Sequence, residues 1–178
     1  MKIALFGSAF NPPSIGHADC IDQLSAYVDI VWLIPSYRHP FSKAMADYSL
    51  RCEWVEAFAK DLPHPAQVMA VEHLISDNLD VDRPIYSYEV IEHLTKLYPE
   101  HQFMLAIGPD NMQAWNRFSH IEQIHSLCQI FVTQERKQVR STGIRQELSL
   151  GYVPSSMLTP GVNLLLKSHN PWEPRYVA

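Results

Sequence analysis

The chain has 178 residues, of which 47% are hydrophobic and 19% charged, with a formal net charge of -5. This length predicts one domain, 1–178, with enough chain for a full hydrophobic core. The negative charge argues against a general nucleic-acid surface, and no apolar run reaches the length of a membrane span. The first residues enter a strand pattern without a signal-type leader, so we expect a cytoplasmic protein.

Strand-like and helix-like segments alternate along the chain. Apolar, β-rich runs predict strands at 2–6, 29–35, 67–71, 102–107 and 129–133. Helical periodicity predicts helices at 19–28, 50–62, 87–98, 121–127 and 144–150, and surface loops at 63–65 and 77–84. We expect 154–178 to form a C-terminal helix around 162–166 and an irregular tail, packed on the domain. The alternation indicates an α/β fold, a Rossmann-like doubly wound five-stranded parallel sheet with helices on both faces.

The loop between the first strand and the first helix carries the strongest functional signal. It reads GSAFNPPSIGH from Gly7 to His17. Small-residue loops at this place in α/β proteins bind phosphates, because the following helix begins with free N–H groups. Gly7 permits a close backbone approach, and Gly16 lets the chain pass tightly into the helix. We expect His17, in the first helical turn, to bond a phosphate or stabilise charge that develops on it.

Other polar segments follow the later strands, and in a parallel sheet they meet the opening loop at one edge. After the last strand, Ser141 and Thr142 are N-cap candidates whose hydroxyls suit phosphate oxygens, and Arg145 lies one turn further on. Each of these residues also fits an ordinary capped surface helix. They predict a second group of phosphate ligands.

Two further segments complete this edge. After the fourth strand, Asp110 is placed to accept ribose hydroxyls, and Trp115 is able to stack a flat ring or to join the core. After the second strand, Lys43 and Arg51 flank a polar loop and are candidates for a second phosphate, although solvated surface cations would look the same.

Metal and disulfide chemistry find little support in the sequence. The three cysteines, Cys20, Cys52 and Cys128, are far apart and odd in number, which fits reduced and mostly buried thiols. Nine histidines raise the idea of a metal hydrolase. The one ligand-like spacing, Glu89 with His93, is explained better by a solvated helix pair, so we predict no protein metal site.

Taken together and in order, these segments resemble the nucleotidyltransferase superfamily of adenylyl- and cytidylyltransferases, and most closely the bacterial nicotinate-nucleotide adenylyltransferases. That family opens with Gly-Gly/Ser-x-Phe-Asp/Asn-Pro-x-His/Thr-x-Gly-His, matched at 7–17. Its late Ser-Ser/Thr-x-Ile-Arg signature is matched at 141–145, and its Gly-x-Asp-Ser/Asn segment with a following tryptophan at 108–115. The stretch 32–43 is similar to its second-strand loop, and 86–89 to its Tyr-Thr/Ser-x-Asp-Thr segment.

The resemblance implies transfer of AMP from ATP to nicotinate mononucleotide, with release of pyrophosphate, in NAD biosynthesis. It implies Mg²⁺ bound mainly through the ATP phosphates. The implied catalytic residues are His17, Ser14 and Arg145. The implied ATP-binding residues are Gly7, Ser8, Ala9, Phe10, Gly16, His17, Gly108, Asp110, Ser141, Thr142 and Arg145. The implied mononucleotide-binding residues are Asn11, Lys43, Arg51, Tyr86, Ser87 and Trp115.

One position departs from the family pattern and keeps alternatives open. Ser14 stands where the family has its first motif histidine, so we expect its hydroxyl to keep a phosphate contact, although it supplies no imidazole. The alternatives are an adenylyltransferase for nicotinamide mononucleotide or another acceptor such as phosphopantetheine, and a catalytically impaired nucleotide-binding homologue. Neither the acceptor nor a homo-oligomer is decided by the sequence.

Overall fold

The computed structural model describes residues 1–38 and 45–173. Five strands form one parallel sheet in the order β3-β2-β1-β4-β5. They are β1 (Lys2–Ser8), β2 (Ile30–Pro35), β3 (Ala66–Val68), β4 (Gln102–Ile107) and β5 (Gln129–Val132). The doubly wound five-stranded fold predicted from the sequence is confirmed. Because the chain runs outward from β1 in both directions, the strand order reverses between β1 and β4, where such sheets bind ligands.

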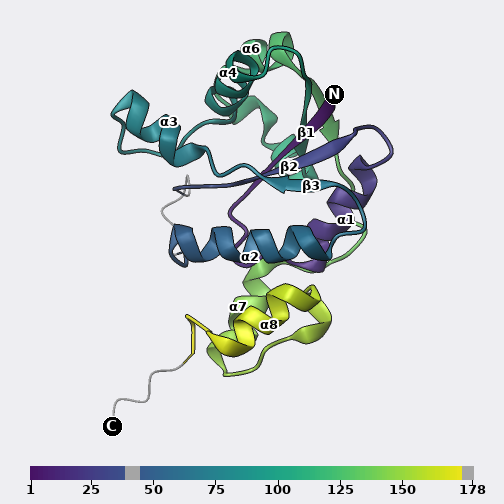
Figure 1. Cartoon of the computed structure of the whole chain (residues 1–178), viewed down its shortest axis with the longest axis vertical. Helices are drawn as coiled ribbons and strands as arrows, with labels where there is room; N and C mark the ends of the chain where they lie inside the picture. The colour runs from purple at the N-terminus through teal and green to yellow at the C-terminus, as the bar shows by residue number, and fades with distance from the viewer. Residues whose placement is uncertain (39–44, 174–178) are drawn as a thin grey trace.

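Helices cover both faces of this sheet (Figure 1). One layer contains α1 (Ile15–Leu24), α2 (Tyr48–Asp61), α7 (Ser141–Ser149) and α8 (Pro160–Ser168). The other layer contains α3 (Glu72–Leu79), α4 (Ser87–Leu97) and α6 (Ile121–Leu127). Short helical turns lie at α5 (Pro109–Gln113), η1 (Trp115–Arg117) and η2 (Ser155–Met157).

The two helical layers bury two separate apolar clusters against the sheet. Strand β1 shows why its apolar run is continuous: Ala4 and Phe6 point to the cluster under α1, α2, α7 and α8, and Ile3 and Leu5 to the opposite one. Alternate side chains of a strand face opposite sides, so a strand covered on both sides is apolar throughout. This central strand delivers the opening loop to the edge of the sheet.

The C-terminal helix is built into the first of these clusters. Val162 and Leu166 of α8 are fully buried with Trp54 of α2. Beyond α8, Trp172 packs against the Trp54 ring with 5.6 Å between ring centroids. Full burial of such side chains stabilises the fold by about 1.5–3 kcal/mol each.

Several element boundaries differ from the sequence predictions. Helix α1 begins four residues early, at Ile15, and ends at Leu24. Helix α7 begins at Ser141 with Arg140 as its N-cap, so the predicted N-cap role of Ser141 or Thr142 is wrong. Helix α3 extends into the predicted loop 77–84 and ends at Leu79. Its C-cap residue, Asp80, has a left-handed conformation with a φ of 50°. Strand β3 stops at Val68 instead of 71.

Gly16 and Gly143 allow a matched test of how tightly the start of α1 packs against the segment before α7. A Cβ at Gly16 would collide with the main-chain oxygen of Val139, whereas one at Gly143 in α7 would meet open space. We expect Gly16→Ala to lower the free energy of unfolding by about 1–3 kcal/mol through overpacking. Gly143→Ala should raise it by about 0.5–1 kcal/mol, because alanine orders a helix at lower entropic cost. Urea denaturation measures both, and equal effects would contradict the packing described.

Candidate functional site

A cleft of about 360 Å³ opens at the sheet edge where the strand order reverses. The ends of β1, β4 and β5 form its floor, and the starts of α1 and α7 close two of its sides. Its lining residues are Phe6, Gly7, Ser8, Gly16, His17, Asp19, Cys20, 106–111, 133–137 and 139–141. The predicted convergence of loop segments at this edge is therefore present.

His17 is held in one orientation by its own loop. Its Nδ1 accepts the backbone N–H of Ser14 at 3.1 Å and lies 2.9 Å from the Ser14 hydroxyl oxygen. Because a backbone N–H only donates, Nδ1 carries no proton in the neutral ring, and Nε2 carries it. Nε2 lies 3.1 Å from the hydroxyl of Ser8, which also lines the cleft. The ring rests on Phe10, with centroids 5.0 Å apart.

The electrostatic setting keeps this imidazole neutral. Desolvation of the ring by the loop lowers the pKa of His17 from 6.5 to about 4. Burial penalises the imidazolium, and neither Ser8 nor Ser14 brings a charge that would compensate. At neutral pH, His17 therefore offers an N–H donor and no positive charge to the cleft.

Ser14 takes a different place from the phosphate contact expected of it. Its side chain is fully buried and does not line the cleft. It is the N-cap residue of α1, and both its N–H and its hydroxyl face Nδ1 of His17. Ser14 thus contacts the ring of His17 and is not among the residues that line the cleft.

The late signature is tied to the opening loop through its side chains. The Ser141 hydroxyl donates to the Pro12 carbonyl at 2.7 Å. Arg145 donates from Nη1 to the Asn11 carbonyl at 2.8 Å and from Nη2 to the Thr142 hydroxyl at 3.2 Å. Partial burial lowers the pKa of Arg145 from its ordinary value, which lies far above neutrality. Among the residues drawn from this signature, Ser141 alone appears in the cleft lining.

The predicted ATP-binding residues therefore divide into two groups. Seven line the cleft: Gly7, Ser8, Gly16, His17, Gly108, Asp110 and Ser141. Four do not: Ala9, Phe10, Thr142 and Arg145. Phe10 is fully buried with a φ of 46°, and its ring belongs to the core. The carboxylate of Asp110 is exposed and paired with Arg140 at 2.9 Å.

Two of the predicted mononucleotide ligands brace the opening loop. Arg51 is 1% exposed and donates to the carbonyls of Ala9 at 2.7 Å and Ala46 at 2.9 Å. The side chain of Asn11 is also buried and accepts the N–H of Ala46 at 3.1 Å. The alternative that Arg51 is a solvated surface cation is wrong, because its guanidinium is buried and bonded to main-chain oxygens. Its assignment to a phosphate stays a prediction. Lys43 lies outside the described residues.

The other mononucleotide candidates lie outside the cleft lining. Tyr86 is 41% exposed, with the guanidinium of Arg83 at 4.7 Å from its ring centroid. Ser87 begins α4. Trp115 packs against Phe118, with ring centroids 4.7 Å apart, beside the second core cluster. Their ligand roles stay predictions.

Three cations line the cleft: Arg136 and Lys137, which the sequence analysis missed, and Arg140, to which it gave no role. They lie on the segment between β5 and α7, directly before Ser141. Their signal was available, since ligands bind beyond the carboxyl ends of parallel strands and this segment follows one. The family motif that follows assigned the phosphate contacts to residues 141–145 instead.

Within residues 1–38 and 45–173, no group of three or more histidine, cysteine, aspartate or glutamate side chains is placed to hold a metal ion. The acidic side chains of the cleft rim are already paired: Asp110 and Glu135 with Arg140, and Asp19 with Arg136. In the same part of the chain, no helix combines the length and apolarity that a bilayer crossing requires.

Comparison with known proteins agrees with this geometry. The cytidylyltransferase-like family model matches residues 5–149. A Campylobacter jejuni protein named as a nicotinate-nucleotide adenylyltransferase is 34% identical over 142 residues, 78% of this chain and 74% of its own. A Porphyromonas gingivalis protein of the same name is 32% identical over 137 residues, 74% of this chain and 66% of its own.

Solved structures give the same result. A Vibrio parahaemolyticus crystal structure named as a nicotinate-nucleotide adenylyltransferase superposes with a TM-score of 0.79 at 35% identity, over 94% of this chain and 92% of that one. A Plasmodium falciparum nicotinic acid mononucleotide adenylyltransferase, at 12% identity and a TM-score of 0.74, shares the fold. This chain belongs to the cytidylyltransferase-like family of nucleotidyltransferases, among the nicotinate-nucleotide adenylyltransferases.

Proposed function

We propose that this chain transfers AMP from ATP to nicotinate mononucleotide, forming the dinucleotide deamido-NAD and pyrophosphate. The observation that carries the proposal is His17, whose Nε2 is fixed toward the cleft between the ends of β1 and β4. The relatives named above support the choice of reaction and acceptor.

The proposed adenylyl transfer needs no strong general base. A phosphate oxygen of the mononucleotide forms the new bond to the α-phosphorus of ATP, and the bond from that phosphorus to the bridging oxygen breaks. The electron pair leaves with pyrophosphate. Since the attacking phosphate is already an anion, positioning and charge stabilisation carry the catalysis. The neutral His17 donates its Nε2 proton in a hydrogen bond to a phosphate oxygen at the reacting centre.

The remaining phosphate contacts come from the start of α7 and the segment before it. The first N–H groups of a helix have no helical acceptor and favour anions, which supports Ser141, at the start of α7 and in the cleft lining, as a ligand of the triphosphate. Lys137 supplies positive charge in the same cleft, and Arg140 offers its guanidinium there beside its carboxylate partners Asp110 and Glu135. Arg145 contributes indirectly, by holding the Asn11 carbonyl of the opening loop.

Mg²⁺ enters this scheme as part of the substrate MgATP. The acidic groups of the cleft rim are engaged with arginines, which fits an ion coordinated mainly by phosphate oxygens and water. When bound, the ion neutralises charge on the triphosphate. The chain's own contribution is to orient the triphosphate through Ser141, Lys137 and Arg140.

A panel of acceptors tests the proposed function directly. Pyrophosphate release from MgATP is measured with nicotinate mononucleotide, nicotinamide mononucleotide and phosphopantetheine. We expect nicotinate mononucleotide to give the highest kcat/KM. A preference for either other acceptor would overturn the substrate assignment. Binding of ATP in calorimetry without turnover of any acceptor would instead support the alternative suggested by Ser14, a nucleotide-binding homologue that does not catalyse the reaction.

The role of His17 is tested by substitution. We expect His17→Ala to lower kcat by about 10²–10³-fold, the usual cost of removing one donor to developing charge. His169→Ala, an exposed histidine after α8, is the matched control and should leave kcat unchanged. Near-full turnover of His17→Ala would contradict the assignment.

Ser14→Ala separates positioning from phosphate binding. The variant loses one hydrogen bond to Nδ1 while the backbone N–H remains. We expect kcat to fall about 2–10-fold, the worth of one hydrogen bond, with the KM for ATP unchanged because Ser14 does not line the cleft. An increase in the KM for ATP would instead indicate a direct phosphate contact.

The neutral state of His17 gives a pH prediction. Its pKa is about 4 in the folded protein and 6.5 in the absence of the fold, so the unfolded chain binds this proton first as the pH falls. The contribution of His17 to stability is complete above pH 6.5 and decreases down to about pH 4. Urea unfolding at pH 7 and pH 5 should show a smaller loss in His17→Gln than in the wild type, and equal losses would contradict the low pKa.

A further inference from the structure

The segment 133–140, which we name the β5–α7 wall, forms one side of the cleft without regular secondary structure. All but one of its residues line the cavity. Its main chain is fixed at the start by the Thr133 N–H on the Ile107 carbonyl at 2.9 Å and at the end by the Arg140 carbonyl, which accepts the Gly143 N–H at 3.1 Å. Between them it has a local bond from the Arg136 N–H to the Gln134 carbonyl at 3.1 Å. A segment of this kind depends on side chains from its neighbours to keep its shape.

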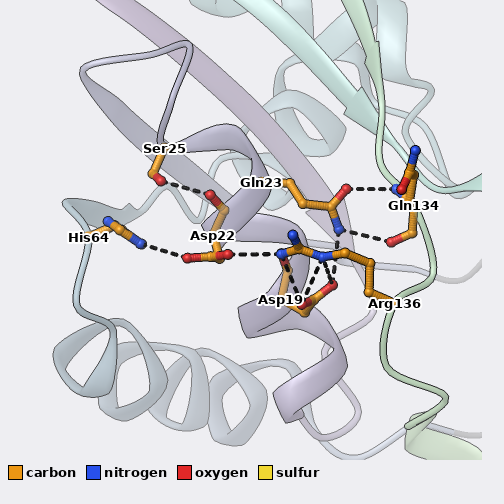
Figure 2. Close-up of polar contacts among 7 residues, drawn as sticks. All are labelled: Asp19, Asp22, Gln23, Ser25, His64, Gln134 and Arg136. Atoms are coloured by element: carbon orange, nitrogen blue, oxygen red, sulfur yellow. Dashed lines mark hydrogen bonds and ion pairs between the residues drawn. The ribbon is translucent and has the colours of Figure 1, made fainter.

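Gln23 of α1 provides the first of these ties (Figure 2). Its Nε2 donates to the Gln134 carbonyl at 2.9 Å, and its Oε1 accepts the Gln134 N–H at 2.8 Å. One side-chain amide thus satisfies both main-chain groups of Gln134, as a neighbouring strand would do. Nε2 also reaches the Asp19 carboxylate at 3.0 Å.

Arg136 provides the second tie. Its Nε lies 3.1 Å from both carboxylate oxygens of Asp19, and its Nη2 lies 2.8 Å from Asp22. Asp19 is 8% exposed, and a fork-shaped guanidinium on a buried carboxylate holds its geometry better than an exposed pair does. The other oxygen of Asp22 lies 3.0 Å from Nε2 of His64, which extends the network to the loop before β3 (Figure 2).

The anchoring residues share a helix with the catalytic histidine. Asp19, Asp22 and Gln23 follow His17 on α1 within two turns. A helix fixes the relative positions of such side chains through its backbone hydrogen bonds. The β5–α7 wall and His17 are therefore placed relative to each other by one rigid element.

We propose that Gln23 and Arg136 are positioning residues that hold the β5–α7 wall at the correct distance from His17 for ATP. The proposal rests on the proposed adenylyl transfer. Gln23 is the cleaner probe of the two, because it does not line the cleft and removes no charge from it. Any effect of its loss on ATP must act through its partners, which are Gln134 of the wall and Asp19, the carboxylate that anchors Arg136 of the wall.

The test compares Gln23→Ala and Gln23→Met with the wild type and with Gln123→Ala, an exposed glutamine of α6. Gln23→Met keeps the length of the side chain and so guards against a folding failure of the alanine variant. We expect both Gln23 variants to raise the KM for ATP about tenfold, with kcat and the KM for nicotinate mononucleotide within about twofold of wild type. Gln123→Ala should change none of these values.

A second readout does not need turnover. Calorimetric titration with a non-hydrolysable ATP analogue should show the same tenfold weakening in both Gln23 variants. An unchanged Kd in folded variants, or an equal rise in both KM values, would overturn the positioning role. If the wild type turned over no acceptor at all, the proposed function would fail, and the analogue titration would still decide whether Gln23 positions the ATP wall.

Discussion

The hydrogen bond from the Ser14 N–H to Nδ1 of His17 is the interaction on which the site depends. It leaves the ring proton on Nε2 and directs that nitrogen to the Ser8 side of the cleft. The bond joins two residues at the start of α1, so it forms only when the helix begins at Ile15 and the preceding loop is closed over it. The direction of one N–H thus follows from how one helix begins.

The closure of that loop is achieved by side chains from distant segments. Arg51 from α2 binds the Ala9 carbonyl, and Arg145 and Ser141 from α7 bind the carbonyls of Asn11 and Pro12. Among the residues that the structure describes, no main-chain N–H is bonded to these carbonyls, and a buried carbonyl without a donor costs about 1–3 kcal/mol. The loop therefore keeps its shape only when the helices on either side of it are in place.

This arrangement explains which site residues the sequence could predict. The strand–loop–helix order placed Gly7, Ser8, Gly16 and His17 at the cleft, and the rule for parallel sheets placed Gly108 beside them. The same reasoning assigned Arg51 and Arg145 to phosphates. An arginine that binds main-chain carbonyls and an arginine that binds a phosphate have the same sequence pattern, because both bind oxygen acceptors near a glycine-rich loop. Burial identifies Arg51 as an arginine bonded within the protein, whereas Arg145 is half-buried and its assignment to a phosphate stays a prediction.

The fold was predicted more fully than the site for a related reason. Strand and helix patterns depend on which residues are apolar, which is a local property of the sequence. The starts at Ser87 and Ile121 were predicted correctly, whereas those of α1 and α7 were missed by four and three residues. The start of α7 depends on a tertiary contact, because the Ser141 hydroxyl binds the Pro12 carbonyl. The cleft wall is set by pairs such as Gln23 with Gln134, 111 positions apart in the chain. No periodicity connects such residues, so the geometry of the ATP side of the cleft depends on contacts that only the folded chain contains.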